Sequence, residues 1–255
     1  MSQPSGVALI TGSARGIGRA IALRLARDGY DIALNDIKED EDLGNVKRDI
    51  DAMGRRAIIC AGDVSKEETV KEMIDTTVEK LGGLDVMVAN AGICFAKPFL
   101  ECTLEDWDRC FDVNGKGVFL CYKYAALKMI EQGKGGRIIG ACSRAGKRSL
   151  PNASIYCATK FTVRSLTQSA ALALKPHGIT VNAYAPGLVD TPLAKNLKSD
   201  YKILGEVLSE DMGSPDDIAG LVSYLASKEA ALVTGILFKR SAETKLQSLI
   251  SCDEF

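Results

Sequence analysis

The chain alternates short apolar runs with longer amphipathic stretches. Within the apolar runs, hydrophobic residues follow one another without the strict alternation of a half-exposed strand. This pattern is typical of parallel strands that are covered on both faces. The predicted strands are residues 6–11, 31–35, 56–60, 85–90, 137–142 and 179–184.

Between these runs, apolar residues recur at the spacing of an amphipathic helix. The predicted helices are residues 16–29, 39–53, 66–81, 104–132, 154–175 and 215–227. Strands that alternate with helices favour a parallel sheet with right-handed crossovers, which is an α/β doubly wound Rossmann fold. No linker, repeat or low-complexity tract divides the 255 residues, so we predict one domain, residues 1–255.

Charge and hydropathy exclude several classes of partner. The formal net charge is −1 and basic residues do not cluster, which argues against a nucleic-acid or membrane-surface partner. No apolar run approaches the ~20 residues of a spanning helix. The amino-terminal segment lacks the basic start of a signal peptide, so we predict a cytoplasmic protein.

Cysteine and histidine usage excludes further chemistry. The eight cysteines form no Cys-x-x-Cys pair, and His177 is the only histidine, so no metal site is expected. Most cysteines lie in apolar stretches and are interpreted as small core residues in a reducing compartment. His177 lies in a turn, which leaves little for a Ser-His-Asp hydrolase.

A glycine-rich turn, "TGSARGIG" (11–18), follows the first strand and begins the first helix. Glycines let the backbone approach a pyrophosphate, and a helix N-terminus supplies free N–H groups. Ligands in this fold class bind beyond the carboxyl ends of the strands. Asp63 and the turn "NAG" (90–92) lie at such ends, where we expect the adenine amino group and the nicotinamide half of a dinucleotide.

Asp36 ends the second predicted strand. A carboxylate there can accept hydrogen bonds from both adenosine ribose hydroxyls and repels a 2′-phosphate; an ordinary turn residue is the alternative. Arg15 and Lys38 could instead pair with a 2′-phosphate. The prediction is therefore NAD(H) as the preferred cofactor, with NADP(H) left open.

Tyr156 and Lys160 lie four residues apart in the predicted helix 154–175. This spacing puts both on one helix face, where the ammonium can approach the phenol oxygen. A phenol with a pKa of ~10 becomes a useful proton donor when a nearby cation stabilises the phenolate. By itself, such a pair is far more often an ordinary helix surface than a catalytic site.

The motifs together resemble the short-chain dehydrogenase/reductase superfamily, to about Gly235. The resemblance is carried by "TGSARGIG", Asp63, "NAG", Asn114, Ser143, "YCATK" (156–160) and "PGLVDT" (186–191). Within the superfamily, the segments "IIGACSRAG" and "GITVNAYAPGLVDTP" are most similar to diacetyl/acetoin reductases and 2,3-butanediol dehydrogenases.

The resemblance implies a catalytic set of four residues. Tyr156 would be the acid/base, and Lys160 would lower its pKa and hold the nicotinamide ribose. Ser143 would hydrogen-bond the substrate carbonyl. Asn114 would interrupt the regular helix bonding and keep a water that links Lys160 to solvent.

The resemblance also implies the remaining contacts. The expected cofactor-binding residues are Gly12, Arg15, Gly16, Ile17, Gly18, Asp36, Asp63, Val64, Asn90, Gly92, Tyr156, Lys160, Pro186, Gly187, Val189 and Thr191. The expected substrate-pocket residues are Cys94, Phe95, Ser143, Ala145, Leu150, Tyr156 and Leu188. A substrate lid is expected at about 188–213.

The implied function is an NAD(H)-dependent oxidoreductase that interconverts a secondary alcohol and a ketone, with acetoin, diacetyl, 2,3-butanediol or polyols as small-molecule substrates. One alternative is an NADPH-dependent 3-oxoacyl thioester reductase, which Arg15 would favour. The other is a non-catalytic dinucleotide-binding protein.

The carboxyl-terminal tail, about 236–255, departs from the family pattern because it lacks the usual Asp-Gly-Gly turn after the last strand. One interpretation is a divergent, partly disordered tail. Another is the loss of a seventh strand and its subunit contacts. The resemblance implies a homo-oligomer, a tetramer or a dimer, whose assembly such a loss would affect.

Overall fold

The computed structural model describes residues 5–198 and 212–240 of the chain. In this part, seven parallel strands form one sheet in the order β3-β2-β1-β4-β5-β6-β7. The strands are β1 Gly6–Thr11, β2 Tyr30–Asn35, β3 Ala57–Ile59, β4 Val86–Ala89, β5 Gly136–Ala141, β6 Ile179–Pro186 and β7 Leu237–Arg240. The order reverses between β1 and β4, which defines a doubly wound fold.

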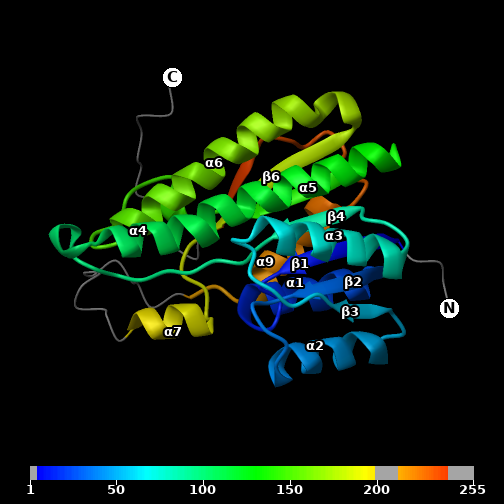
Figure 1. The fold of residues 1–255 in the computed structure, drawn as a ribbon, viewed down its shortest axis with the longest axis horizontal. Coiled ribbons are helices and arrows are strands. Elements are labelled where there is room, and N and C mark those ends of the chain that lie inside the picture. Colours follow the sequence, from blue (N-terminus) through cyan, green and yellow to red (C-terminus); the bar gives the residue numbers. More distant parts are fainter. Residues whose placement is uncertain (1–4, 199–211, 241–255) are drawn as a thin grey trace.

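Helices cover both faces of the sheet (Figure 1). They are α1 Gly16–Arg27, α2 Glu41–Ala52, α3 Glu67–Leu81, α4 Leu104–Phe111, α5 Gly117–Gln132, α6 Ser154–Leu174, α7 Pro192–Lys198 and α9 Pro215–Ala226. One buried core lies between the sheet and α3, α5 and α6, and a second lies between the sheet and α1, α2 and α9. The predicted single-domain α/β fold is confirmed.

Local sequence explains where several helices begin and end. Thr103 with Asp106, and Ser214 with Asp217, form capping boxes at the starts of α4 and α9. Helix α3 ends at Gly82, which adopts the left-handed conformation that glycine tolerates best. Such signals place the predicted elements within about two residues of the observed ones.

The predicted helix 104–132 is not continuous. Helix α4 is followed by a π-helical turn, Asp112–Lys116, and then by α5. A π-helical turn inserts one residue into the regular hydrogen-bonding pattern and commonly marks a functional site. Asn114 lies within this turn and is fully buried.

The interpretation that the altered tail removes a seventh strand is wrong. Residues Leu237–Arg240 form β7, which pairs in parallel with β6 from Ala183 to Pro186. Leu237 packs against one core and Phe238 against the other, so the alternating side chains specify the strand without the family's Asp-Gly-Gly turn. Residues 241–255 of the predicted tail lie outside the described residues.

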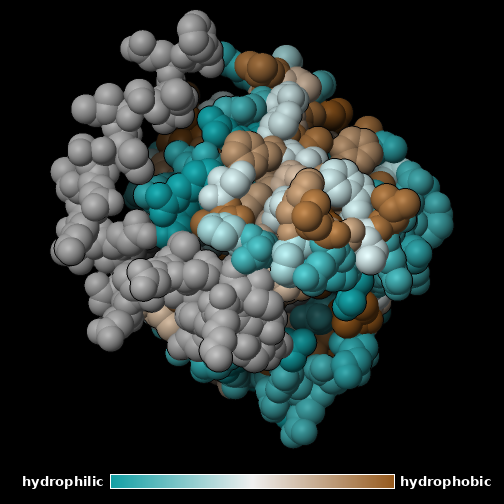
Figure 2. Space-filling model, turned by 90° about the vertical axis from the view of Figure 1, so that its left-hand side faces the viewer, coloured by the Kyte–Doolittle hydropathy of each residue, from teal (hydrophilic) through white to brown (hydrophobic). Residues whose placement is uncertain are grey.

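All strands point the same way, to the left in Figure 1, where α7 lies beyond their carboxyl ends. Figure 2 views the molecule from that side, where apolar residues are interspersed with polar ones. Among residues 5–198 and 212–240, no helix has the length and apolar character to cross a lipid bilayer.

Candidate active site

A cavity of about 480 Å³ lies at the carboxyl ends of the strands. Its walls come from the loops after β1, β2, β3, β4, β5 and β6 and from helix α6. Each residue that the sequence predicted to contact the cofactor lines this cavity. The fold therefore gathers residues that lie far apart in the chain, from Gly12 to Ala194.

The glycine loop has the geometry of a phosphate cradle. Gly12 and Gly16 adopt φ angles of +63° and +57°, which favour glycine. A Cβ atom on Gly18 would lie 2.0 Å from the carbonyl oxygen of Gly12, so the loop closes only around a glycine there. Helix α1 begins without a side-chain cap from Arg15, which leaves its first N–H groups available to a pyrophosphate.

The carboxylate of Asp36 is held at the cavity wall by two backbone amides. Its Oδ2 accepts from the N–H of Ala14 at 3.1 Å, and its Oδ1 accepts from the N–H of Ile37 at 2.9 Å. Each carboxylate oxygen keeps a further lone pair that can accept from a ribose hydroxyl. Arg15 lines the same cavity, whereas Lys38 is not among its lining residues.

Ser143, Tyr156 and Lys160 meet at one part of the cavity wall. The Ser143 side chain lies close enough to the Tyr156 hydroxyl to act on its pKa, which it lowers. The ammonium of Lys160 donates to the carbonyl oxygen of Ala141 at 2.8 Å and lies 5.5 Å from the centre of the Tyr156 ring. A hydroxyl pair beside a buried ammonium can donate hydrogen bonds to one substrate oxygen and stabilise charge on it.

Burial has the largest effect on the pKa values of Tyr156 and Lys160. It raises the pKa of Tyr156 well above its ordinary value, although Ser143 acts in the opposite direction. It also lowers the pKa of Lys160. The chain's own side chains therefore do not shift the Tyr156 pKa toward neutrality, because desolvation outweighs the lowering effect of Ser143.

Asn114 lies behind the cavity wall and acts on it through neighbours. Its Oδ1 accepts from the N–H of Ile93 and its Nδ2 donates to the carbonyl oxygen of Ile93, both at 2.8 Å. Its Nδ2 also donates to Thr159 Oγ1 at 3.1 Å. A Cβ atom on Gly92 would lie 3.2 Å from Asn114 Oδ1 and 3.6 Å from Lys160 Nζ, so this glycine brings the strand end close to both side chains.

The expected substrate pocket is gathered in part. Five of its residues line the cavity: Cys94, Ser143, Leu150, Tyr156 and Leu188. Ala145 is fully buried and packs with Ala153 and Cys157 behind the wall, and Phe95 is also absent from the lining. Burial raises the pKa of the Cys94 thiol to about 12, so this side chain is neutral and weakly polar at neutral pH.

The lid predicted at 188–213 is described only near its two ends. Helix α7 begins it, and Pro192, Leu193 and Ala194 line the cavity. A parallel bridge joins Val189 to Gly213, whose N–H donates to the carbonyl oxygen of Leu188 at 2.9 Å. Residues 199–211 lie outside the described part, so their role as a lid remains a prediction.

Several lining residues were not anticipated. They include Asn35, Ile37, Ile93, Val113, Cys142, Arg144, Ala153 and Tyr184. Most are direct neighbours of predicted residues at strand ends, so the strand-end rule could have found them. Tyr184 differs, because it lies within β6 and its sequence environment indicates only a buried strand residue.

The sheet order, the glycine loop and the cavity at the strand ends define an α/β protein that binds a dinucleotide. A family model described as short chain dehydrogenase matches residues 6–202. The chain belongs to the short-chain dehydrogenase family. It is therefore an oxidoreductase that acts on CH–OH groups with a nicotinamide dinucleotide.

Known proteins match nearly the whole chain. A short-chain dehydrogenase/reductase of Armillaria gallica is 52% identical and the match covers 90% of this chain and 92% of the relative. The L-2,3-butanediol dehydrogenase of Corynebacterium glutamicum is 42% identical, over 91% of this chain and 95% of the relative. The structure of carveol dehydrogenase from Mycobacterium avium in complex with NAD has a TM-score of 0.86 and 31% identity, over 94% of this chain and 97% of that chain.

Proposed function

We propose that this protein is an NAD(H)-dependent oxidoreductase that interconverts a secondary alcohol and a ketone. The observation that carries the proposal is the meeting of Ser143, Tyr156 and Lys160 in the same cavity that holds Asp36 and the glycine loop. Because a reacting oxygen and a dinucleotide would share this cavity, proton and hydride transfer can occur at one carbon–oxygen bond.

The residues divide the proton chemistry among them. In reduction, Tyr156 donates its phenolic proton to the ketone oxygen, and in oxidation it accepts the proton of the alcohol. Ser143 donates a hydrogen bond to the same oxygen, because its side chain lies close to the Tyr156 hydroxyl. Lys160 holds the nicotinamide ribose and stabilises the phenolate. The nicotinamide supplies or accepts the hydride.

Asn114 completes the proposed catalytic set without touching the substrate. Its amide fixes the backbone at Ile93 and contacts Thr159, which precedes Lys160. We propose that it keeps a water through which Lys160 exchanges protons with solvent. The π-helical turn supports this role, because it frees backbone groups near Asn114 from regular helical bonding.

The proposed substrates are acetoin, diacetyl, 2,3-butanediol or similar small alcohols and ketones. The butanediol dehydrogenase relative supports this class. The side chains of Cys94, Leu150 and Leu188 give the cavity apolar walls, which suit a small or medium carbonyl compound. A 3-oxoacyl thioester reductase is the second candidate, and Arg15 in the cavity wall favours it.

Asp36 supports NAD(H) over NADP(H). Both of its oxygens are already fixed by backbone amides, so the carboxylate cannot readily move away from a 2′-phosphate. The resulting repulsion of like charges disfavours the phosphorylated cofactor. Arg15 acts in the opposite sense, and the two effects are separated by measuring both cofactors.

We further propose a cytoplasmic homo-oligomer, either a dimer or a tetramer. Free thiols such as those of Cys94 and Cys142 support a reducing compartment. Large apolar side chains are exposed on α5 and α6, among them Leu127 and Leu172, which are 53% and 79% exposed. Such surfaces support association between copies, and light scattering of the purified protein would measure the mass.

The first experiment follows absorbance at the nicotinamide band with diacetyl or acetoin, with NADH and NADPH assayed in parallel. NADH should support faster turnover. In Tyr156→Phe, turnover should fall by about 10²- to 10⁴-fold while NADH binding persists. Tyr122→Phe is the control, since Tyr122 is buried and bonds Thr167 away from the cavity.

Three results would contradict the proposal. Turnover with NADPH alone would show that Arg15 decides the cofactor and would favour the 3-oxoacyl reductase. Equal turnover of Tyr156→Phe and the parent would remove Tyr156 from the chemistry. Cofactor binding without turnover of any tested carbonyl would indicate a binding protein.

A further inference from the structure

The side chain of Tyr184 connects two distant parts of the sheet. Tyr184 lies on β6 and is 1% exposed. Its hydroxyl donates to Oδ1 of Asn90, at the end of β4, at 2.7 Å. Strand β5 lies between β4 and β6, and there Tyr184 is in register with Ala141. This small side chain leaves room for the phenol to reach across β5.

Asn90 continues the connection to β1. Its Nδ2 donates to the carbonyl oxygens of Thr11 at 2.8 Å and of Gly12 at 3.0 Å. The backbone N–H groups of Asn90 and Ala91 both donate to Thr11 Oγ1 at 3.0 Å. The carboxyl ends of β1, β4 and β6 are therefore joined by one hydrogen-bonded chain.

The Asn90 amide also touches the glycine loop directly. A Cβ atom on Gly12 would lie 3.0 Å from Asn90 Nδ2, and one on Gly18 would lie 2.6 Å from it. The amide therefore occupies the space between the first glycine of the loop and the first turn of α1. Where this amide sits determines how closely the two glycines approach each other.

We propose that Tyr184 is a positioning residue for the phosphate-binding loop and that it acts through Asn90. The phenol supplies the hydrogen bond to Asn90 Oδ1 and so leaves both amide protons directed at the carbonyls of Thr11 and Gly12. Without the hydroxyl, Oδ1 would lose a donor beside the cavity and would turn toward water. The Nδ2 contact with Gly12 would then weaken, and the loop would lose its fixed conformation.

The phenol is suited to permanent donation. Burial raises the pKa of Tyr184 above its ordinary value, so its proton stays in place at neutral and mildly alkaline pH. The identity of the ligand, a dinucleotide pyrophosphate, rests on the proposed function, whereas the effect of Tyr184 on the loop does not.

The test compares Tyr184→Phe with Tyr122→Phe. Tyr122 is 4% exposed and its hydroxyl bonds Thr167 at 3.0 Å on the opposite face of the sheet, so its loss is a matched structural change. Hydrogen–deuterium exchange of the amides at 12–18 is measured in the protein without cofactor. The dissociation constant for NADH is measured by fluorescence, and kcat at saturating NADH.

Tyr184→Phe should speed exchange in the loop and raise the NADH dissociation constant, each by about 3- to 10-fold, since one hydrogen bond is lost. Its kcat at saturation should stay within about twofold of the parent. Tyr122→Phe and Tyr184→Phe should lower the melting temperature by similar amounts, since each loses one buried hydrogen bond. Tyr122→Phe should leave loop exchange and the NADH affinity unchanged.

Three outcomes decide the matter differently. Unchanged loop exchange in Tyr184→Phe would overturn the positioning role. Faster loop exchange with unchanged NADH affinity would overturn the contribution of Tyr184 to dinucleotide binding. If loop exchange is faster in Tyr184→Phe but neither this variant nor the parent protein binds NADH, the positioning role would be upheld and the proposed function contradicted.

Discussion

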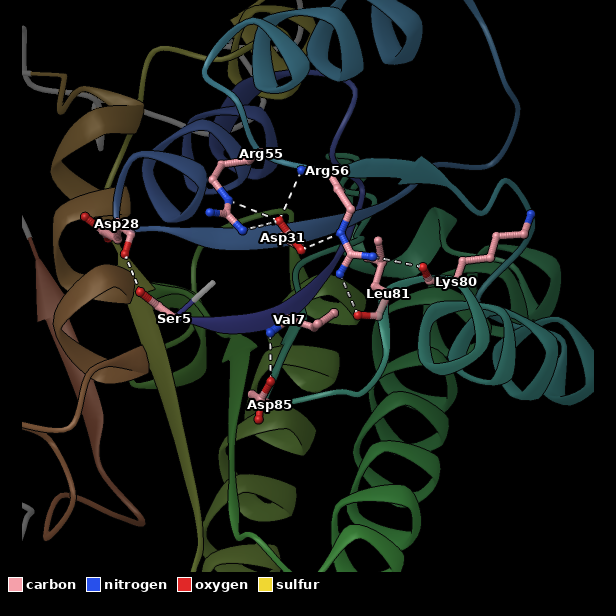
Figure 3. Close-up of polar contacts among 9 residues, drawn as sticks. All are labelled: Ser5, Val7, Asp28, Asp31, Arg55, Arg56, Lys80, Leu81 and Asp85. Carbon is pink, nitrogen blue, oxygen red and sulfur yellow. Dashed lines mark hydrogen bonds and ion pairs between the residues drawn. The ribbon is translucent and has the colours of Figure 1, made fainter. Parts of the chain in front are cut away.

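The two ends of the parallel strands bury charged groups in opposite ways. We call the side of the sheet where the strands begin the amino edge, and the side where they finish the carboxyl edge. At the amino edge, Asp31 is 1% exposed and accepts from the guanidinium groups of Arg55 at 3.0 Å and Arg56 at 2.8 Å (Figure 3). At the carboxyl edge, Lys160 is 3% exposed and donates to a backbone carbonyl. Within the described residues, Lys160 forms no ion pair with a carboxylate, whereas Asp31 forms two.

The pKa values report this difference. Burial acts to raise the pKa of Asp31, but hydrogen bonds from Arg55 and Arg56 outweigh it and the net shift is downward. Burial lowers the pKa of Lys160 without such compensation. A paired buried charge is tolerated by the fold, whereas a lone one destabilises it and is free to bind a ligand. The comparison therefore separates an edge built for stability from one built for function.

The amino edge also ties several elements together. Arg56 Nη2 donates to the carbonyl oxygen of Leu81 at 2.9 Å, and Asp85 accepts from the N–H of Val7 at 2.7 Å. Figure 3 shows these contacts converging on the starts of β1 and β2 and on the end of α3. The scaffold is thus fixed at the edge farthest from the cavity.

The largest expected effect is at Lys160. Lys160→Met should lower kcat by about 1000-fold, because the phenolate of Tyr156 loses its cation. The same change should raise the free energy of unfolding by about 1 kcal/mol, since an unpaired buried ammonium is replaced by an apolar chain. Steady-state kinetics and urea unfolding measure the two effects. Lys47→Met, at an exposed ion pair with Asp51, should change neither kcat nor the free energy of unfolding. A lower free energy of unfolding in Lys160→Met would contradict the contrast between the two edges.

Replacing Asp31 should reduce stability and leave turnover unchanged. Asp31→Asn should lower the free energy of unfolding by about 3 kcal/mol, because two guanidinium groups lose their anion. The kcat of the folded protein should be unchanged. The control is Asp49→Asn, whose pair with Arg19 is about half exposed and should contribute no more than about 0.5 kcal/mol. Equal losses in the two variants would mean that the buried network adds nothing special.

A smaller effect concerns cofactor choice at Asp36. Asp36→Asn should reduce the ratio of kcat/KM for NADH over NADPH by about 10-fold, because the charge that repels a 2′-phosphate is removed. Asp40→Asn is a matched loss of charge four residues away, where the side chain caps α2. The ratio should not change in Asp40→Asn, and an unchanged ratio in Asp36→Asn would assign selectivity elsewhere.

The smallest effects are the pH dependences, which appear in acid for Asp31 and in alkali for Lys160. The folded pKa of Asp31 is lowered, so its contribution is present above the ordinary value of ~3.9 and is lost as pH falls through the folded pKa. The stability gap between parent and Asp31→Asn should therefore narrow in acid.

The folded pKa of Lys160 is also lowered, and its penalty is present below that pKa and fades as pH rises toward ~10.4. The advantage of Lys160→Met should therefore shrink in alkali. Urea unfolding across the pH range measures both gaps, and gaps that stay constant would show that neither group titrates differently in the folded chain.

Sequence patterns predicted most of the fold because the strands are apolar and the helices carry local signals, such as the capping box at Ser214 and Asp217. The cavity lining was predictable because strand ends meet at one edge of a parallel sheet. The π-helical turn at Asn114 was predicted only as an interruption, since its hydrogen bonds depend on packing. Ala145 was predicted in the substrate pocket, but it is fully buried and packs with Ala153 and Cys157.

Tyr184 shows what a linear pattern cannot contain. Its hydroxyl meets Asn90 across 94 positions of the chain and one intervening strand. A tyrosine inside an apolar strand reads as a core residue, and only the sheet order reveals its partner. Strand β7 shows an error of the opposite kind. The missing Asp-Gly-Gly turn suggested that the strand was lost, but the strand forms with two apolar side chains packed on alternate faces of the sheet.

The bridge between Val189 and Gly213 has a consequence for how this chain can change over evolution. The two ends of the segment between them are held together, because the N–H of Asp190 donates to the carbonyl oxygen of Gly213 and the N–H of Gly213 donates to that of Leu188. Closing a longer segment at a fixed point costs only about 0.6 kcal/mol for each doubling of its length. Insertions and deletions at this position can therefore change the length of the segment while the loops that line the dinucleotide cavity keep their positions.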